Sequence, residues 1–141
     1  MTNLTTQDTF SSALVYAKNY HRWCLSAFQN YIHGDLLEIG VAHGSYYELL
    51  PSNIRYVGLD INPSYVADAK KRGLKAFVAD IVDPDLYEKA DGMRFDCILC
   101  FNVLEHILED ARALENLAHL LKDGGGIFVS LCRHFLFYFH K

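Results

Sequence analysis

A run of small residues follows an apolar stretch in the first third of the chain and could form a binding turn. Residues 36–44 read LLEIGVAHG, with Gly40, Ala42 and Gly44 at every second position. Glycine adopts positive φ at little cost, and its missing side chain lets a ligand approach the backbone. Glu38 stands just before the turn, and its carboxylate would repel a phosphate and attract a cation. The motif therefore predicts a turn that binds a positively charged small molecule.

The glycine spacing differs from that of dinucleotide-binding proteins. Their G-x-G-x-x-G fingerprint places a pyrophosphate at a helix N-terminus, whereas here the small residues alternate and an acid precedes them. A nucleotide-dependent oxidoreductase on a similar fold is an alternative that predicts NAD binding, but this spacing argues against it.

Two further acids end apolar runs. Asp60 ends YVGLD, 22 residues after Glu38, and an ionised carboxylate there can accept hydrogen bonds from both hydroxyls of a ribose. Its alternative role is the N-cap of a helix that begins near Pro63. Asp80 ends FVAD and could accept a hydrogen bond from the exocyclic amine of an adenine, or be an ordinary loop acid.

A fourth motif, FDCILCFNVLEHI, covers residues 95–107. Phe101 and Asn102 end its apolar run, and Glu105 and His106 open a helical pattern. We consider His106 the candidate general base, because an imidazole has an ordinary pKa of about 6.5. The alternatives are that His106 holds the loop through a hydrogen bond and that Glu105 simply complements the helix dipole.

The elements that must position these residues alternate between apolar runs and helical patterns. A helix is predicted over residues 10–33, and Gly34 would end it. The predicted strands cover residues 35–40, 54–60, 74–80, 94–101 and 127–131. The predicted helices between them cover residues 43–50, 63–72, 84–90 and 104–121.

The helix over residues 104–121 carries a leucine stripe that includes Leu108, Leu114 and Leu117, and the glycines at 124–126 would break this helix before the last strand. Strand and helix alternate five times, which predicts an α/β fold with a doubly wound, Rossmann-like parallel sheet covered on both faces. Such a sheet binds ligands beyond the carboxyl ends of its strands, where the winding reverses. We expect the glycine turn and the acids to meet there.

Five motifs in this order resemble the class I methyltransferases that depend on S-adenosylmethionine (SAM). The resemblance is to the small-molecule branch, whose motifs read L-E-x-G-x-G-x-G, a ribose acid, an x-D acid, V-L-E-H-I and L-x-P-G-G. The fifth motif here is LLKDGGGIFVS, residues 120–130, and the resemblance covers residues 35–131. It implies a sheet order of 3-2-1-4-5 with further strands beyond, and SAM as the cofactor, whose sulfonium and ammonium groups suit the acid before the turn.

The resemblance also implies a set of cofactor-binding residues. These are Glu38, Gly40, Ala42, Gly44, Asp60, Ile61, Asp80, Ile81, Phe101 and Asn102. The glycine turn would frame the methionine moiety and Asp60 would bind the ribose. Asp80 and Ile81 would line the adenine, while Phe101 and Asn102 would flank the sulfonium. An N-terminal helix within residues 1–33 would cover the pocket as a lid, for which Tyr16, Tyr20 and Trp23 are suited.

Two departures from the family pattern affect what the resemblance implies. Ala42 replaces the middle glycine, which would weaken SAM binding if that position requires positive φ. The family normally continues with a helix and an antiparallel strand pair that help to form the acceptor pocket, and these are missing from the 141 residues. The apolar tail, residues 132–141, covers the exposed edge of the last strand, pairs with a second copy in a homodimer, or marks a truncated gene product.

Composition favours one domain over residues 1–141, because 51% of the residues are apolar and the net charge is only −4. The one basic cluster, residues 70–72, lies at a predicted helix end, so we expect no nucleic-acid partner. No apolar run approaches the roughly 20 residues that span a membrane, and the N-terminus has no secretory pattern. We therefore expect a cytoplasmic protein without a membrane partner.

Cys97 and Cys100 form a C-x-x-C within a predicted strand. Successive side chains of a strand point to opposite faces, so residues three apart cannot easily form a disulfide or bind one ion. We predict two buried free thiols and no metal site.

The activity implied by the resemblance is methyl transfer from SAM to an O, N or C nucleophile of a small-molecule acceptor. Catalysis would consist mainly of placing that nucleophile about 3 Å from the methyl group, with His106 as the general base for an acceptor of high pKa. The alternative is a non-catalytic or truncated SAM-binding module.

Overall fold

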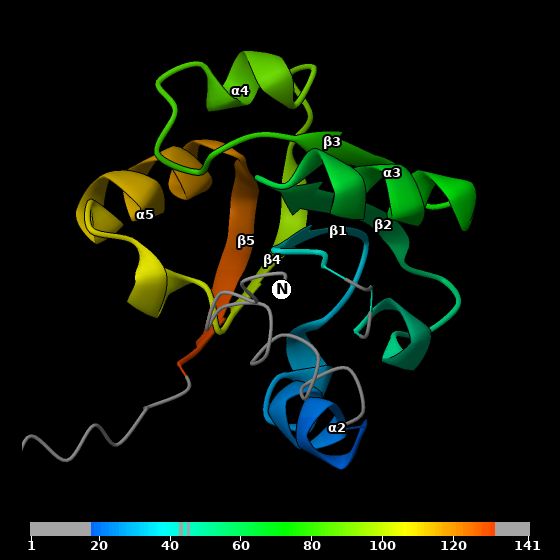
Figure 1. Cartoon of the computed structure of the whole chain (residues 1–141). Helices are drawn as coiled ribbons and strands as arrows, with labels where there is room; N and C mark the ends of the chain where they lie inside the picture. The colour runs from blue at the N-terminus through cyan, green and yellow to red at the C-terminus, as the bar shows by residue number, and fades with distance from the viewer. Residues whose placement is uncertain (1–17, 43, 45, 132–141) are drawn as a thin grey trace, which may run out of the picture.

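The computed structural model describes residues 18–42, 44 and 46–131 (Figure 1). Five parallel strands form one sheet in the order β3-β2-β1-β4-β5, which confirms the predicted doubly wound topology. The strands are β1 (Asp35–Ile39), β2 (Arg55–Asp60), β3 (Ala76–Val78), β4 (Phe95–Phe101) and β5 (Leu121–Ser130). The winding reverses between β1 and β4, because β1 pairs with β2 on one side and with β4 on the other.

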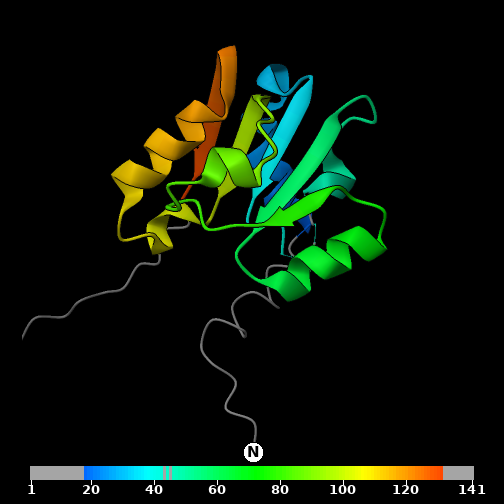
Figure 2. The same cartoon turned by 90° about the horizontal axis from the view of Figure 1, so that it is seen from above.

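Helices cover both faces of the sheet. The α-helices are α2 (Lys18–Ser26), α3 (Pro63–Lys71), α4 (Leu86–Lys89) and α5 (Asp110–His119), and the 3-10 helices are η1 (Gln29–Tyr31), η2 (Tyr47–Leu49) and η3 (Leu104–His106). Helix α3 lies beside β2 and β3, and α5 lies beside β5 (Figure 2). Among the described residues, no helix combines the length and the apolar character that crossing a membrane requires.

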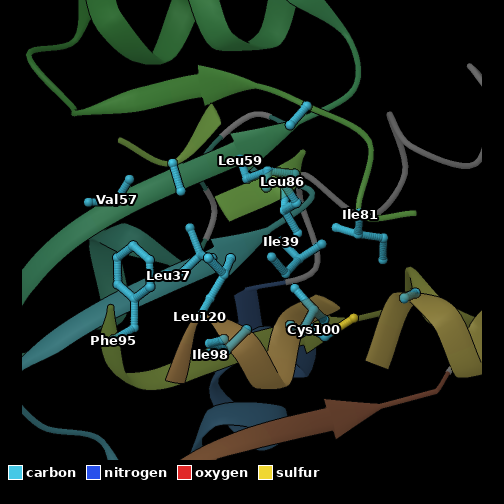
Figure 3. Packing of buried hydrophobic residues seen from close by; sticks show 14 residues of the cluster. Leu37, Ile39, Val57, Leu59, Ile81, Leu86, Phe95, Ile98, Cys100 and Leu120 are labelled. Atoms are coloured by element: carbon cyan, nitrogen blue, oxygen red, sulfur yellow. The ribbon is translucent and has the colours of Figure 1, made fainter. Parts of the chain in front are cut away.

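Strand side chains alternate between two cores. Leu37 and Ile39 enter the core under α4 and α5 (Figure 3), whereas Leu36 enters the core under α2 and α3. Cys97 belongs to the second core and Cys100 to the first, and both are buried free thiols. The prediction that this C-x-x-C pair points to opposite faces is confirmed.

The N-terminal helix is shorter than predicted over its described part. Helix α2 ends at Ser26, because Phe28 leaves helical geometry with ψ near 1° and the chain continues as η1. Gly34 has a φ of +65°, and a Cβ there would lie 2.2 Å from Oδ2 of Asp96. Gly34 is therefore required for the turn into β1 rather than for ending α2. Residues 10–17, with the proposed lid residue Tyr16, and the tail 132–141 lie outside the described residues.

The helix predicted over residues 104–121 is two separate elements. Ile107 is extended, with ψ of 120°, so the chain leaves η3 and enters α5 only at Asp110. The predicted leucine stripe does not match the buried face of the helix. Leu108 is 99% exposed and Leu114 is 37% exposed, whereas Leu117 is fully buried. The buried face of α5 is formed by Ala113 and Leu117.

The glycines at 124–126 do not break the preceding helix, because α5 already ends at His119. They lie inside β5, which begins at Leu121, and the register with β4 shifts between Phe95 and Cys97. A Cβ on Gly125 would lie 2.9 Å from the carbonyl oxygen of Phe95. The prediction of strand 127–131 was therefore too short, because these glycines permit a bulge and close approach rather than a turn.

Candidate cofactor-binding site

The chain after β1 turns across the end of β2. The backbone N–H groups of Gly40 and Val41 donate to the carbonyl oxygen of Leu59 at 2.8 and 3.1 Å. Gly40 has a φ of +76°, and a Cβ there would lie 2.7 Å from Cγ2 of Val103 in the loop after β4. The turn therefore lies between the carboxyl ends of β2 and β4, at the point where the winding reverses.

Ala42 occupies a conformation that favours glycine. Its φ is +38°, and Gly44 two residues later has a φ of +68°. A Cβ on Gly44 would lie 2.7 Å from Nη1 of Arg72. All three small residues of the motif thus have positive φ, and only Ala42 carries the steric cost of a side chain there.

Asp60 connects the glycine turn to the end of β2. Its Oδ2 accepts a hydrogen bond from the Ala42 N–H at 2.9 Å, and its Oδ1 accepts one from the Asn62 N–H at 2.8 Å. Asn62, not Asp60, is the N-cap of α3, since Oδ1 of Asn62 accepts from the Ser64 N–H at 2.9 Å. Because an ionised carboxylate has about four acceptor positions, Asp60 retains capacity for ligand hydroxyls.

Glu38 is a buried acid directly beneath the turn. It is only 3% exposed, and the hydroxyl of Tyr56 donates to its Oε2 at 2.6 Å. The pKa of Glu38 is raised to about 8, mainly by burial and in smaller part by the nearby charge of Asp60, while the Tyr56 hydrogen bond and the charge of Arg72 act in the opposite direction. Glu38 therefore carries a proton at neutral pH, which differs from the anionic carboxylate that the sequence suggested.

The loop after β4 faces the N-terminal helix. Asn102 has a φ of +56°, and its Oδ1 accepts a hydrogen bond from the Tyr20 hydroxyl at 3.0 Å. The rings of Tyr20 and Trp23 lie 6.1 Å apart, and Trp23 is 69% exposed. The structure thus brings α2 to the end of β4, as a lid over this site would require.

The adenine-side residues divide into exposed and buried groups. Ile61 is 66% exposed and directly follows Asp60, so it offers an apolar surface beside the ribose acid. Asp80 lies two residues beyond β3, and its Oδ1 accepts from the Val82 N–H at 3.1 Å. Ile81 is 3% exposed and belongs to the core under α4 and α5, which leaves its backbone as the part that can contact a ligand.

Phe101 lies in the core rather than at the open edge. It is 6% exposed, and its ring packs 5.6 Å from the Phe28 ring and 5.0 Å from the Tyr46 ring, measured between centroids. Its part in flanking a ligand is therefore restricted to its backbone and to fixing the position of Asn102.

His106 lies in η3 and is exposed. Its backbone N–H donates to the carbonyl oxygen of Val103 at 2.9 Å, but its imidazole makes no hydrogen bond within the described part of the chain. The alternative that its side chain holds the loop therefore finds no support, and the ring is accessible to a ligand.

Sequence reasoning missed Tyr56 as the partner of Glu38. Glu38 pairs with Gly58, and Tyr56 is two residues earlier on the same face of β2. A Cβ on Gly58 would lie 3.2 Å from the Tyr56 hydroxyl, so glycine leaves the space through which this hydroxyl reaches the acid. Gly58, the glycine in YVGLD, is the sequence feature that could have indicated this hydrogen bond. Interpreting it requires the strand register that sets Gly58 opposite Glu38.

Sequence comparisons show the family of this chain. A family model described as a methyltransferase domain matches residues 37–127. A ubiquinone biosynthesis O-methyltransferase of Xylella fastidiosa (strain 9a5c) is 32% identical over 101 residues, which cover 67% of this chain and 40% of that protein. An uncharacterized protein of Methanocaldococcus jannaschii is 30% identical over 127 residues, covering 82% of this chain and 58% of that protein.

Solved structures share the fold. SAM-bound CalS10, an amino pentose methyltransferase from Micromonospora echinaspora, superposes with a TM-score of 0.71 at 21% identity, covering 94% of this chain and 59% of that one. Streptomyces venezuelae DesVI gives a TM-score of 0.70 at 18% identity, covering 93% of this chain and 59% of that one. The chain belongs to the methyltransferase domain family and has the class I methyltransferase fold. It spans about 40% of the length of the first curated relatives that it matches.

Proposed function

We propose that this chain binds SAM at the turn after β1 and supports methyl transfer to a small-molecule acceptor. The observation that carries the proposal is the hydrogen bond between Asp60 and the Ala42 N–H. It places a carboxylate with remaining acceptor capacity beside a turn of three small residues, at the edge of the sheet where a ligand binds. Family membership supports the same cofactor.

Each part of the site suits one part of this cofactor. Asp60 would accept hydrogen bonds from the ribose hydroxyls, and the exposed side chain of Ile61 would cover one face of the adenine. Asp80 and the backbone of Ile81 would contact the adenine edge, while the turn and Asn102 would lie along the methionine moiety. The cofactor supplies an activated methyl group, and the protein's part is to orient it and to exclude water.

The acceptor is proposed to be a small molecule with an oxygen or nitrogen nucleophile. Several curated relatives are O-methyltransferases of ubiquinone biosynthesis, and one structural neighbour is an amino pentose methyltransferase. His106, exposed and without a side-chain partner among the described residues, would take the proton from the nucleophile. If His106→Ala leaves turnover unchanged from pH 6 to 9, His106 is not the base.

Calorimetry with SAM and its demethylated product tests the binding proposal directly. We expect Ile61→Asp to weaken SAM binding at least tenfold, because it places a charge on the exposed apolar surface beside Asp60. Leu108→Asp, at a site that is 99% exposed, is the matched control and should bind as the wild type does. Failure of the wild-type protein to bind SAM at millimolar concentration would refute the proposal.

A radiolabelled methyl-transfer screen over small acceptors separates catalysis from binding alone. Methyl transfer that is lost when Asp60 or His106 is substituted would support the proposal that the chain is an enzyme. Binding of SAM with no transfer to any acceptor would favour the non-catalytic SAM-binding module.

The outer edge of β5 faces no other strand of the described residues. We propose this edge as the place where a second copy would pair in a homodimer, because an open edge is a template for strand addition. Light scattering measures the oligomeric state, and a mass of one chain at high concentration would exclude the homodimer. The cytoplasmic location predicted from the sequence stays a prediction.

A further inference from the structure

A hollow lies at the opposite end of the sheet from the glycine turn. Its volume is about 340 Å³, within the roughly 300–1,000 Å³ range of small-molecule pockets. It opens where β1, β2 and β4 begin and where the chain enters β3. Its lining residues are Asp35, Arg55, Tyr56, Val57, Lys75, Met93, Arg94 and Phe95.

Among the described residues, Asp35 is the only acid that lines this hollow, and its charge is already compensated by two cations. Asp35 accepts hydrogen bonds from Nη2 of Arg55 at 2.9 Å and from Nε of Arg55, and it also pairs with Lys122. These two cations hold the pKa of Asp35 far below its usual range. Asp96, behind it, pairs with Lys122 at 2.9 Å. The two acids and these two cations thus compensate one another.

Lys75 and Arg94 remain without an acidic partner in the part of the chain that the structure describes. Nζ of Lys75 donates to Sδ of Met93 at 3.1 Å, its only side-chain hydrogen bond within the described ranges, and a thioether is a weak acceptor. Arg94 donates through Nη1 to the carbonyl oxygen of Leu121 at 3.1 Å, and its guanidinium carbon lies 5.5 Å from the Tyr87 ring centroid. Both side chains are exposed. Two basic residues without an acidic partner among the described residues therefore line one hollow, in a chain whose net charge is −4.

We propose that this hollow binds the phosphate group of a small phosphate ester, with Lys75 and Arg94 as its ligands. A phosphate dianion matches two positive charges, and the guanidinium fork suits its oxygen geometry. The contacts to Leu121 and Tyr87, which do not line the hollow, use one Arg94 nitrogen and one face of the guanidinium, so its other nitrogens stay available as donors among the described residues. The apolar part of the lining, including Val57, Met93 and Phe95, would contact the organic part of the ester.

This site does not depend on the proposed cofactor site. The glycine turn and Asp60 follow the carboxyl ends of β1 and β2, whereas Asp35 and Arg55 begin those same strands. A ligand at the hollow would be a separate effector or a separate part of a reactant. Loss of one site should therefore leave binding at the other unchanged.

Nuclear magnetic resonance titration of backbone amides tests the proposal. The probes are inorganic phosphate, phenyl phosphate and acetate, at constant ionic strength. We expect saturable shifts at the amides of Lys75, Arg94 and their neighbours with both phosphates, tighter binding of phenyl phosphate, and binding of acetate at least tenfold weaker. Shifts that do not saturate, or equal binding of acetate and phosphate, would overturn the proposal.

Matched variants identify the ligands. Lys75→Gln and Arg94→Gln should each weaken phenyl phosphate binding about tenfold or more. Arg94→Lys should retain only part of the wild-type affinity, because lysine lacks the two parallel N–H donors of the guanidinium. Lys70→Gln, an exposed lysine on α3, is the control for general charge and should bind like the wild type. Equal effects of Lys70→Gln and Lys75→Gln would show non-specific attraction and reject the site.

Discussion

The hydroxyl of Tyr56 donates a hydrogen bond of 2.6 Å to Oε2 of Glu38 in the buried layer beneath the glycine turn. Gly58 leaves room for this bond, because a Cβ at that position would lie 3.2 Å from the Tyr56 hydroxyl and 3.0 Å from Cγ2 of Val41. Burial raises the pKa of Glu38 to about 8, although this hydrogen bond favours the ionised form and so acts against the rise. Sequence patterns suggested a fixed negative charge, whereas the structure provides one that titrates near physiological pH.

The first prediction concerns stability against pH. Glu38 has an ordinary pKa of 4.5 and a folded pKa of about 8, so the folded state binds more protons than the unfolded state between these values. The free energy of unfolding should therefore fall as pH rises from about 4.5 to 8, by a few kcal/mol from this group. Urea unfolding at pH 5, 6.5 and 8 measures the slope.

Glu38→Gln is the variant that isolates this contribution. It keeps the shape and an acceptor for Tyr56 but cannot ionise, so its unfolding free energy should fall less with pH than that of the wild type. The proton linkage extends to the proposed cofactor, because a bound cation favours ionised Glu38. SAM affinity should rise between pH 6.5 and 8.5 in the wild type and change less in Glu38→Gln. Parallel pH profiles for both proteins would contradict the linkage.

The second prediction concerns backbone strain in the turn. Ala42 has a φ of +38°, a conformation in which a Cβ is unfavourable by about 1 kcal/mol. Ala42→Gly should therefore raise the free energy of unfolding by about 0.5–1 kcal/mol, and SAM should bind at least as tightly as to the wild type. Thermal and urea unfolding measure the change.

Ala69→Gly provides a matched control for this substitution. Ala69 is buried inside α3, where glycine destabilises a helix by about 1 kcal/mol. The same chemical change should thus have opposite signs at the two positions. Destabilisation at both would mean that the conformation of Ala42 carries no strain.

The third prediction concerns the contact between α2 and the end of β4. Tyr20→Phe removes the hydroxyl that donates to Asn102, a bond worth about 0.5–1.5 kcal/mol. Amide hydrogen exchange should become faster in α2, while the strands keep their protection. Tyr31→Phe is the control, because the Tyr31 side chain is 62% exposed and its hydroxyl makes no hydrogen bond within the described ranges. Equal exchange in all three proteins would show that this bond does not hold the helix.

The sequence allowed the fold and the place of the site to be predicted because both depend on local pattern. Gly40 and Asp60 each follow an apolar run that ends at one sheet edge, so their proximity follows from parallel strand order. The Glu38–Tyr56 bond could not be predicted, since it depends on the register that sets Gly58 opposite Glu38.

The predicted bounds of helices and strands were wrong where contacts between residues distant in sequence determine them. The bulge in β5 depends on how closely Gly125 approaches the backbone of Phe95, and no neighbour in sequence encodes that distance. The break before α5 depends on the extended conformation of Ile107, where leucine spacing alone favoured one continuous helix.

The fourth prediction tests the corrected phase of α5. Leu117 is fully buried, whereas Leu114 is 37% exposed, although both belong to the stripe that helical spacing suggested. Leu117→Ala should lower the free energy of unfolding by about 2–5 kcal/mol, because it leaves a cavity between α5 and the sheet. Leu108→Ala, at a side chain that is 99% exposed, should change stability by less than about 0.5 kcal/mol, and Leu114→Ala should fall between the two. Urea unfolding of the three variants ranks them, and a loss at Leu114 equal to that at Leu117 would place the buried face of the helix where leucine spacing alone puts it.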